Sequence, residues 1–465
     1  MKLLIKQSSA LQLLAVLLFI NVPFSCKKAD FLSTPSNQLL EQSSRSHRPS
    51  PKESSERADV VYEWYKFMTN LQLSASPQPN VFAQNRAFAY IGIGLFESVQ
   101  PGIKGGSSFS PKLYEMPKMP KPDMSKDYLW SASANAALAS MFKLFLSSLT
   151  PANAATIDAK EAEIYNQLKQ TTSEDVLRRS EAFGRSIATA IFNWSTSDNF
   201  NISSVGYTPV NEPWAWVPTP PNYPTPVGYN LQFSRPLLKY SLHATAPPIP
   251  VPYSTDPASA FYKAAYEVYD LGGATTATPA DKATANWWAD AGGTNTGVPA
   301  PYHLLSIITG VLESQQAGLW KAAEVYAKAG IAQKDGPIIT FRAKYQYNLL
   351  RPITYIQQHI DPTWLSHLLT PPYPDYTSGL VALYGPVIEV LINEFGDIPV
   401  IDNTYAWRGL PARHFSSLSA LREEAAVSRV YAGIHFRFTQ ELSITMGAKL
   451  GDEIDKIRVV GPEYQ

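Results

Sequence analysis

The stretch PPYPDYTSGLVALYG, residues 371–385, joins a segment rich in proline and turn residues to an apolar run. Ser378 and Gly379 stand at the junction, and the residues after them have the apolar spacing of a helix. A glycine lets a ligand approach the backbone closely, and the first N–H groups of a helix attract anions. The stretch therefore predicts a helix whose start is either a plain N-cap or an anion site.

A second stretch, KYQYNLLRPITYI at 344–356, carries two cations. Lys344 and Arg351 are seven residues apart, about two helical turns, so this spacing places both on one helical face. Pro352 disfavours helical geometry at Arg351, and we expect the helix to end or kink there. Such a pair is either a solvated surface or part of an anion site.

A third stretch, SRVYAGIHFRF at 428–438, carries Arg429 and His435. They are six positions apart in the chain, so on a straight helix they lie about 120° apart. Gly433 lies between them and can end the helix, which would let His435 turn back toward Arg429. A histidine here is either a hydrogen-bonded core residue or part of the same site.

Apolar residues at three- and four-residue spacing recur along the chain and predict an all-α protein. The helices that this spacing predicts span 58–73, 81–99, 127–148, 151–169, 173–196, 256–271, 279–291, 300–316, 317–334, 336–350, 379–396, 416–432 and 436–458. Asn80 and Thr150-Pro151 are typical helix starts. Alternating strand patterns are nearly absent. We therefore expect one large helical bundle domain.

Residues 201–257 are dense in proline and aromatic side chains, a composition that excludes helix. A loop of this length in a compact domain is usually functional or packed as a lid. We expect a well-packed cover over the helices, with an aromatic ligand platform as the alternative.

The composition fits a folded domain without a bulk nucleic-acid surface. The 465 residues are 45% hydrophobic, and 39 Lys and Arg residues balance 39 Asp and Glu residues. This charge balance argues against a nucleic-acid binder. The sequence does not indicate the oligomeric state.

The N-terminus has the pattern of an export signal. Lysines precede an apolar run from Leu11 to Ile20, which is too short to span a bilayer. Cys26, the single cysteine, follows this run and resembles the lipid-modified cysteine of a bacterial lipoprotein, although Pro23 departs from that pattern. The alternative is a free thiol after a buried helix. Lysines follow Cys26, which favours the outer membrane over inner-membrane retention.

We therefore expect three parts: a signal peptide at 1–25, a flexible tether at 26–57 and a helical domain at 58–465. The tether has too little apolar surface to fold. The protein is expected to be an exported outer-membrane or periplasmic lipoprotein, held at a membrane only through its lipid anchor.

Taken in order, the three stretches resemble the type-2 phosphatidic acid phosphatase and vanadium-dependent haloperoxidase superfamily. The shared pattern is K, six residues, R-P; then S-G; then S-R, five residues, H. The segments HIDPTW, TPPYPDYTSG, RGLPARHFSSLS and VPTPPNY also resemble bacterial haloperoxidase-type members. The resemblance covers roughly residues 59–458 and implies a fold built around two four-helix bundles.

The resemblance also implies roles for single residues. Lys344, Arg351 and Arg429 match the cations that hold the oxygens of vanadate or phosphate. The Ser378 hydroxyl and the Gly379 backbone match the remaining oxygen contacts. His435 matches the axial histidine, which binds vanadium in haloperoxidases and attacks phosphorus in phosphatases.

Two positions depart from the pattern. Leu380 stands where the superfamily has its general acid–base histidine, and leucine cannot transfer a proton. General acid–base catalysis contributes roughly 10²- to 10⁴-fold in rate, so this change affects turnover more than anion binding. Thr439 stands where phosphatases have an aspartate that orients the second histidine, which weakens the phosphatase interpretation.

Other histidines could support the pocket. His414 is a candidate to replace the missing proton-transfer group. His303 is a candidate to support the residues that bind the anion without contacting the anion itself. His359 and His367 are expected to be structural. The sequence has no compact zinc-binding motif.

Three functions follow from these observations. The first is a vanadate-dependent haloperoxidase that uses hydrogen peroxide to oxidise a halide. The second is a secreted phosphatase that hydrolyses small phosphate esters in the same pocket. The third is a weakly active or non-catalytic lipoprotein that binds an oxyanion, with Leu380 marking lost chemistry.

Overall fold

A computed structural model gives the fold of most of the chain. The described residues are 56–73, 80–146, 151–202, 206–290 and 298–460, and they belong to one compact unit. The expected signal peptide, nearly all of the expected tether with Cys26, and the start signal at Thr150 lie outside these ranges.

The all-α prediction is confirmed. The described helices of eight or more residues are α1 (Asp59–Leu73), α2 (Val81–Val99), α3 (Trp130–Phe145), α4 (Pro151–Leu168), α5 (Glu174–Ser195), α7 (Ala260–Gly272), α8 (Pro279–Trp287), α9 (Ala300–Ser314), α10 (Leu319–Tyr347), α11 (Pro352–His359), α12 (Val381–Phe395), α13 (Leu418–Tyr431) and α14 (Arg437–Asp455). The short helix α6 spans Ser241–Ala244. Within the described ranges, no helix is both long and apolar enough to cross a membrane.

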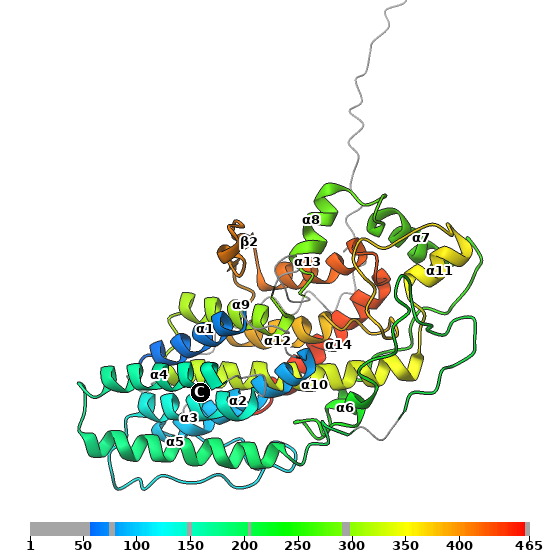
Figure 1. The fold of residues 1–465 in the computed structure, drawn as a ribbon. Helices are drawn as coiled ribbons and strands as arrows, with labels where there is room; N and C mark the ends of the chain where they lie inside the picture. The colour runs from blue at the N-terminus through cyan, green and yellow to red at the C-terminus, as the bar shows by residue number, and fades with distance from the viewer. Residues whose placement is uncertain (1–55, 74–79, 147–150, 203–205, 291–297, 461–465) are drawn as a thin grey trace, which may run out of the picture. The chain divides into compact units, whose positions relative to one another are not determined.

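The helices pack in two groups that share α10 (Figure 1). In the first group α10 packs against α2, and α2 packs against α3 and α5. In the second group α10 packs against α12 and α14, and α13 packs against both of these helices. Gly92 of α2 and Gly330 of α10 permit the close approach of these two helices. A Cβ at Gly92 would lie 2.5 Å from the carbonyl oxygen of Tyr326, so only glycine fits there. The shared helix therefore carries residues of both bundles.

Local signals fix several helix limits. The Asn80 side chain accepts N–H groups of Phe82 and Ala83 at 2.9 and 3.3 Å, and α2 begins at Val81 as predicted. Ser173 caps α5 by accepting the N–H of Val176. The capping side chains therefore mark these starts in the sequence itself.

Four features of the fold differ from the sequence prediction. Helix α6 lies inside 201–257, from which helix was excluded, because Ser241–Ala244 contains no proline. A break between 334 and 336 was predicted, but α10 continues through Pro337, because tertiary packing buries this part of the helix on all sides. Helix α11 was not predicted. A pair of antiparallel strands, β1 (Val400–Asp402) and β2 (Arg413–Phe415), was also missed. Three-residue strands are too short to show alternation.

The proline-rich loop packs as a cover, as expected. The Trp216 N–H donates to the carbonyl of Asn348, and the Leu350 N–H donates to the carbonyl of Trp214. The hydroxyl of Tyr376 donates to the carbonyl of Pro248 at 2.7 Å. The described part of the loop therefore covers the segments that carry the candidate site.

Candidate functional site

The Ser378–Gly379 turn lies directly before α12 and is fixed on α14. The buried Ser378 donates its N–H to Ser443 Oγ at 2.9 Å. Its hydroxyl lies 3.5 Å from the N–H of Val381, where it can only accept. The Ser378 O–H can therefore still donate to a ligand.

Lys344 reaches this turn from the last part of α10. Its Nζ donates to the carbonyls of Pro374 and Asp375 at 2.7 and 2.9 Å. The helix ends before Asn348, whose φ of 50° is left-handed. The prediction that Lys344 and Arg351 share a helical face is therefore wrong, because the helix stops before it reaches Arg351.

Arg351 nevertheless lies close to Lys344, although it is not part of α10. It is the residue before α11, with φ −83° and ψ 154°, which confirms the effect predicted for Pro352. Its Nε donates to the carbonyl of Tyr373 at 2.8 Å, and its Nη1 donates to the carbonyl of Ile434 at 2.7 Å. Lys344 Nζ and Arg351 Cζ lie 4.7 and 5.0 Å from the centroid of the Tyr373 ring. Two cations thus flank one tyrosine.

The third stretch turns back on itself as predicted. Helix α13 ends at Tyr431, and Gly433 has a φ of 78°. The N–H of Ile434 donates to the carbonyl of Arg429 at 3.2 Å, which closes the helix end. A left-handed residue at this point reverses the chain and carries His435 back into the interior.

His435 stands among the three predicted cations. Arg351 Nη1 lies 3.2 Å from its Nε2 and 3.3 Å from its Nδ1. Burial, followed by the charges of Arg351, Lys344 and Arg429, lowers the pKa of His435 well below its usual value. The ring is therefore neutral at physiological pH and keeps one nitrogen lone pair.

The sequence interpretation missed Asp375, which is fully buried beside this ring. Its Oδ1 lies 2.9 Å from His435 Nδ1, and its Oδ2 accepts the hydroxyl of Thr439. Burial raises the pKa of Asp375 to about 6, against the lowering effect of Arg351. The carboxylate places the ring proton on Nδ1 and leaves the lone pair on Nε2. Asp375 follows Pro374 in the stretch PPYPDYTSGLVALYG. It is a single carboxylate among aromatic residues, and this is the feature from which the sequence could have indicated its role.

Leu380 is half-buried and packs against the main hydrophobic core. The nearest polar side chain to its neighbour Gly379 belongs to Tyr373. The Tyr373 hydroxyl lies 3.4 Å from the point where a Cβ on Gly379 would stand. A proton-bearing group therefore lies beside the Ser378–Gly379 turn, although the histidine of the superfamily pattern is absent.

His303 is fully buried between two carboxylates. Its Nδ1 lies 2.9 Å from Asp290 Oδ1, and its Nε2 lies 2.8 Å from Asp402 Oδ2. Burial alone would lower its pKa, but Asp290 and Asp402 outweigh it and raise the pKa of His303 to about 10. The Trp288 ring stacks on His303 at 5.0 Å, and the Trp288 carbonyl accepts Arg429 Nη1. His303 therefore supports the segment that holds Arg429.

Three other histidines lie away from this pocket. His414 is exposed on β2, where it pairs with Ile401. His359 Nε2 lies 3.1 Å from the Tyr253 hydroxyl, and His367 Nε2 lies 3.0 Å from Asn286 Oδ1. None of these contacts reaches the cations around His435.

The charges of the pocket suit an anion. Lys344, Arg351 and Arg429 are buried around His435, and Asp375 is the carboxylate that acts on Lys344 and Arg351. Burial lowers the pKa of all three cations, and Asp290 offsets part of the charge of Arg429. Because buried uncompensated charge is unfavourable, an anion carrying about one to two negative charges fits this set of donors.

Fold and site together define a class, an all-helical protein in which buried cations surround a neutral histidine. Residues 324–458 match the family model described as the VCPO second helical-bundle domain. The vanadium chloroperoxidase of Curvularia inaequalis is 22% identical, over 69% of this chain and 68% of that protein.

Solved structures agree. The crystal structure of the first bacterial vanadium-dependent iodoperoxidase is similar with a TM-score of 0.77 and 26% identity, over 90% of this chain and all of that chain. A holo-type bacterial vanadium-dependent chloroperoxidase shares the fold with a TM-score of 0.64 and 14% identity, over 87% and 98% of the two chains. The family-model match, the fungal relative and the solved structures together support assignment of the chain to the haloperoxidase superfamily.

Proposed function

We propose that this protein binds vanadate in the pocket around His435 and uses hydrogen peroxide to oxidise a halide. The observation that carries the proposal is the convergence of Lys344, Arg351 and Arg429 on a neutral histidine ring. The similarity to a vanadium chloroperoxidase and to a vanadium-dependent iodoperoxidase supports the same reaction class.

The chain's own residues bind and orient the oxyanion in this proposal. The planar guanidinium groups of Arg351 and Arg429 can each donate two N–H groups to two oxygens. Lys344 contributes a point charge, and the Ser378 hydroxyl donates because it accepts from the backbone. His435 Nε2 offers its lone pair, since Asp375 holds the proton of the other nitrogen. Vanadate, when bound, would activate hydrogen peroxide, the two-electron oxidant, toward the halide.

Proton transfer requires a group other than Leu380. We assign it to the Tyr373 hydroxyl, which lies beside Gly379 while its ring contacts Lys344 and Arg351. His414 carries no such argument, because it is exposed on β2.

A halide assay with vanadate-loaded protein tests these assignments. The wild type should oxidise iodide or bromide with peroxide, and His435→Ala should not. Tyr373→Phe should lower the rate about 100-fold, within the range of acid–base catalysis. Leu380→His should raise the rate and make it largely independent of Tyr373. Tyr345→Phe is the matched control, because that hydroxyl bonds the Val227 carbonyl.

Three results would contradict parts of the proposal. Halide oxidation by the wild type that equals His435→Ala rules out the peroxidase. Vanadate binding without turnover in the wild type, with activity in Leu380→His, identifies a disabled enzyme that only binds the anion. Equal rates for Tyr373→Phe and the wild type remove Tyr373 as the proton-transfer group.

Phosphate-ester hydrolysis is the second candidate, and Asp375 favours it. A histidine nucleophile needs a partner that stabilises its positive ring, and Asp375 Oδ1 lies 2.9 Å from His435 Nδ1. Asp375 would therefore take the role of the aspartate that phosphatases have at the position of Thr439. Hydrolysis of an aryl phosphate that vanadate blocks, and that Asp375→Asn abolishes, would support this function over halide oxidation.

We also propose that a lipid on Cys26 holds the protein at a membrane. Lipid attachment at Cys26 should place the protein in the membrane fraction of its cell. Cys26→Ser should move it to the soluble fraction, with the vanadate pocket intact. An unchanged distribution would exclude the lipid anchor.

A further inference from the structure

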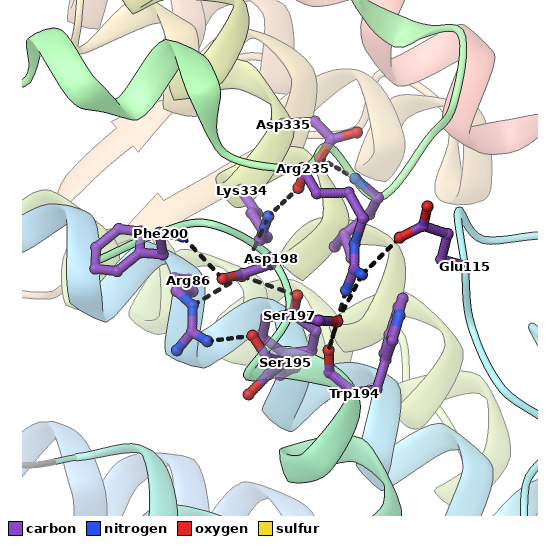
Figure 2. Close-up of polar contacts among 12 residues, drawn as sticks. Arg86, Glu115, Trp194, Ser195, Ser197, Asp198, Phe200, Arg235, Lys334 and Asp335 are labelled. Carbon is purple, nitrogen blue, oxygen red and sulfur yellow. Dashed lines mark hydrogen bonds and ion pairs between the residues drawn. The ribbon is translucent and has the colours of Figure 1, made fainter. Parts of the chain in front are cut away.

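The cations near α2 and α10 pair with carboxylates (Figure 2). The carboxylate of Asp198, just after α5, accepts Arg86 Nε at 2.8 Å and lies 3.6 Å from Lys334 Nζ. Arg235 pairs with Glu115 at 3.0 Å. A carboxylate partner therefore fixes the direction of each of these cations.

Arg429, in the pocket around His435, is held differently. Among the described residues it forms one hydrogen bond, in which its Nη1 donates to the carbonyl oxygen of Trp288 at 2.5 Å. Burial lowers the pKa of Arg429 and the charge of Asp290 partly reverses this, but no ion pair joins the two side chains within the described ranges. A guanidinium has five N–H groups, so Arg429 keeps four for a ligand. Its direction therefore depends on the position of the Trp288 carbonyl.

Trp288 follows α8 directly, and three contacts fix its fully buried side chain. The ring stacks on His303, with 5.0 Å between the ring centroids, and meets Tyr384 edge-on at 5.3 Å. Its Nε1 donates to Glu424 Oε1 at 2.9 Å. Because a side chain fixed by packing and by a hydrogen bond restricts the backbone of its own residue, these contacts also place the carbonyl that accepts Arg429.

Glu424 connects Trp288 to α13 and to the strand pair. It lies on α13 five positions before Arg429, so Trp288 bridges two points of the same helix. The Oε1 atom of Glu424 also accepts Arg413 Nη1 from β2. The end of α8 is thereby held at a fixed place along α13. The Glu424 side chain is 32% exposed, so it can be replaced without opening a cavity in the core.

We propose that Glu424 and Trp288 are positioning residues, which together direct the Arg429 guanidinium toward the oxyanion. Glu424 fixes the indole, the indole fixes the backbone carbonyl, and the carbonyl holds one N–H group of Arg429. The remaining N–H groups then meet the ligand in one orientation, so less side-chain freedom is lost when the ligand binds. This role rests on the proposed oxyanion site around His435.

Isothermal titration of the full-length protein with vanadate, and separately with inorganic phosphate, tests this role. Glu424→Leu should weaken both affinities about tenfold, the lower end of what partners of ligating residues contribute. Glu424→Gln keeps an oxygen that accepts the indole N–H and should bind like the wild type. Trp288→Phe keeps an aromatic ring without the N–H and should weaken binding as Glu424→Leu does. Glu423→Leu is the matched control, because it removes the adjacent carboxylate of α13, whose charged neighbours are Arg422 and Asp397.

A double-mutant cycle separates positioning of Arg429 from general support of the fold. In the Arg429→Gln background, Glu424→Leu should cause no further loss of affinity, because Glu424 acts on the anion only through that arginine. A general loss of structure would instead weaken binding to the same extent in both backgrounds.

Several outcomes would overturn the positioning role. Equal affinity in the wild type and Glu424→Leu is one, and a loss that persists in the Arg429→Gln background is another. A loss in Glu424→Gln as large as that in Glu424→Leu would show that the charge acts and not the hydrogen bond. A wild type that binds neither anion would overturn the proposed oxyanion site together with the positioning role. If Glu424→Leu does not fold, Trp288→Phe with and without Arg429→Gln decides the question.

Discussion

His303 is fixed in position by two carboxylates. Both ring nitrogens contact carboxylates at 2.9 and 2.8 Å, and the ring is fully buried. The pair of carboxylates keeps the ring positive, since its pKa is raised to about 10 while that of Asp402 is lowered to about 2. Removing one partner from such a buried set leaves an uncompensated charge.

His303→Gln should therefore destabilise the protein by about 3–5 kcal/mol at pH 7. The raised pKa stabilises the fold fully below the unfolded value near 6.5, and this stabilisation is lost as the pH rises through about 10. Urea unfolding at pH 7 and pH 10 measures the difference between wild type and variant, which should shrink at pH 10. His414→Gln, at an exposed position, should change stability at neither pH.

Asp375 orients the His435 ring, which is proposed to bind the anion. Asp375→Asn should weaken vanadate binding by about 10- to 100-fold, because partners that orient a ligating histidine typically contribute that much. Isothermal titration with vanadate measures the change. Thr439→Ser keeps the hydroxyl that Asp375 accepts and should bind like the wild type. An unchanged affinity in Asp375→Asn would show that the carboxylate does not orient His435.

At the scale of elements, α10 and α12 approach most closely at Gly336. A Cβ on Gly336 would lie 2.1 Å from the carbonyl oxygen of Ala382, a backbone atom that cannot move alone. Pro337 follows in the same helix, where it removes one backbone hydrogen bond. The packing of both bundles on α10 outweighs these local preferences.

Gly336→Ala should destabilise the protein by about 1–3 kcal/mol, the usual effect of overpacking. Gly310→Ala in α9 is the matched control, because the nearest atom to its Cβ would be 4.0 Å away. That variant should be neutral or more stable by up to about 1 kcal/mol, since alanine favours helix. Urea midpoints compare the two, and equal effects would contradict the close approach of α10 and α12.

At the scale of the whole molecule, the candidate site joins three segments far apart in the chain. Lys344 comes from α10, Ser378 from the turn before α12, and His435 from the turn after α13. Together with Arg351 and Arg429, this arrangement buries like charges, which an anion can offset. Ligand binding should therefore stabilise the entire fold.

Vanadate at 100 times its dissociation constant should stabilise the wild type by about 2.7 kcal/mol and raise its unfolding midpoint. Arg429→Gln should lose most of this shift, because it removes one of the three cations around His435. Arg437→Gln is the control, since that arginine pairs with Glu267 outside the pocket. Differential scanning calorimetry with and without vanadate checks the shift, and an equal shift in both variants would argue against the pocket.

Much of the fold follows from local sequence signals. The apolar spacing and Asn80 predict α2 with its observed limits. Pro352 predicts the extended backbone of Arg351, and Gly433 predicts the reversal before His435. These features depend on the dihedral preferences and capping groups of residues close together in the chain, so the sequence alone determines them.

Tertiary structure decided the rest. Local rules predict a break between 334 and 336, but packing keeps α10 continuous. The contact of Asp375 with His435 joins residues 60 positions apart, and the placement of Tyr373 beside Gly379 depends on the path of the whole turn. Sequence thus determined which residues can hold an anion. Only the packing of distant segments decided which side chains face it, because long-range contacts are set by the burial of whole helix faces.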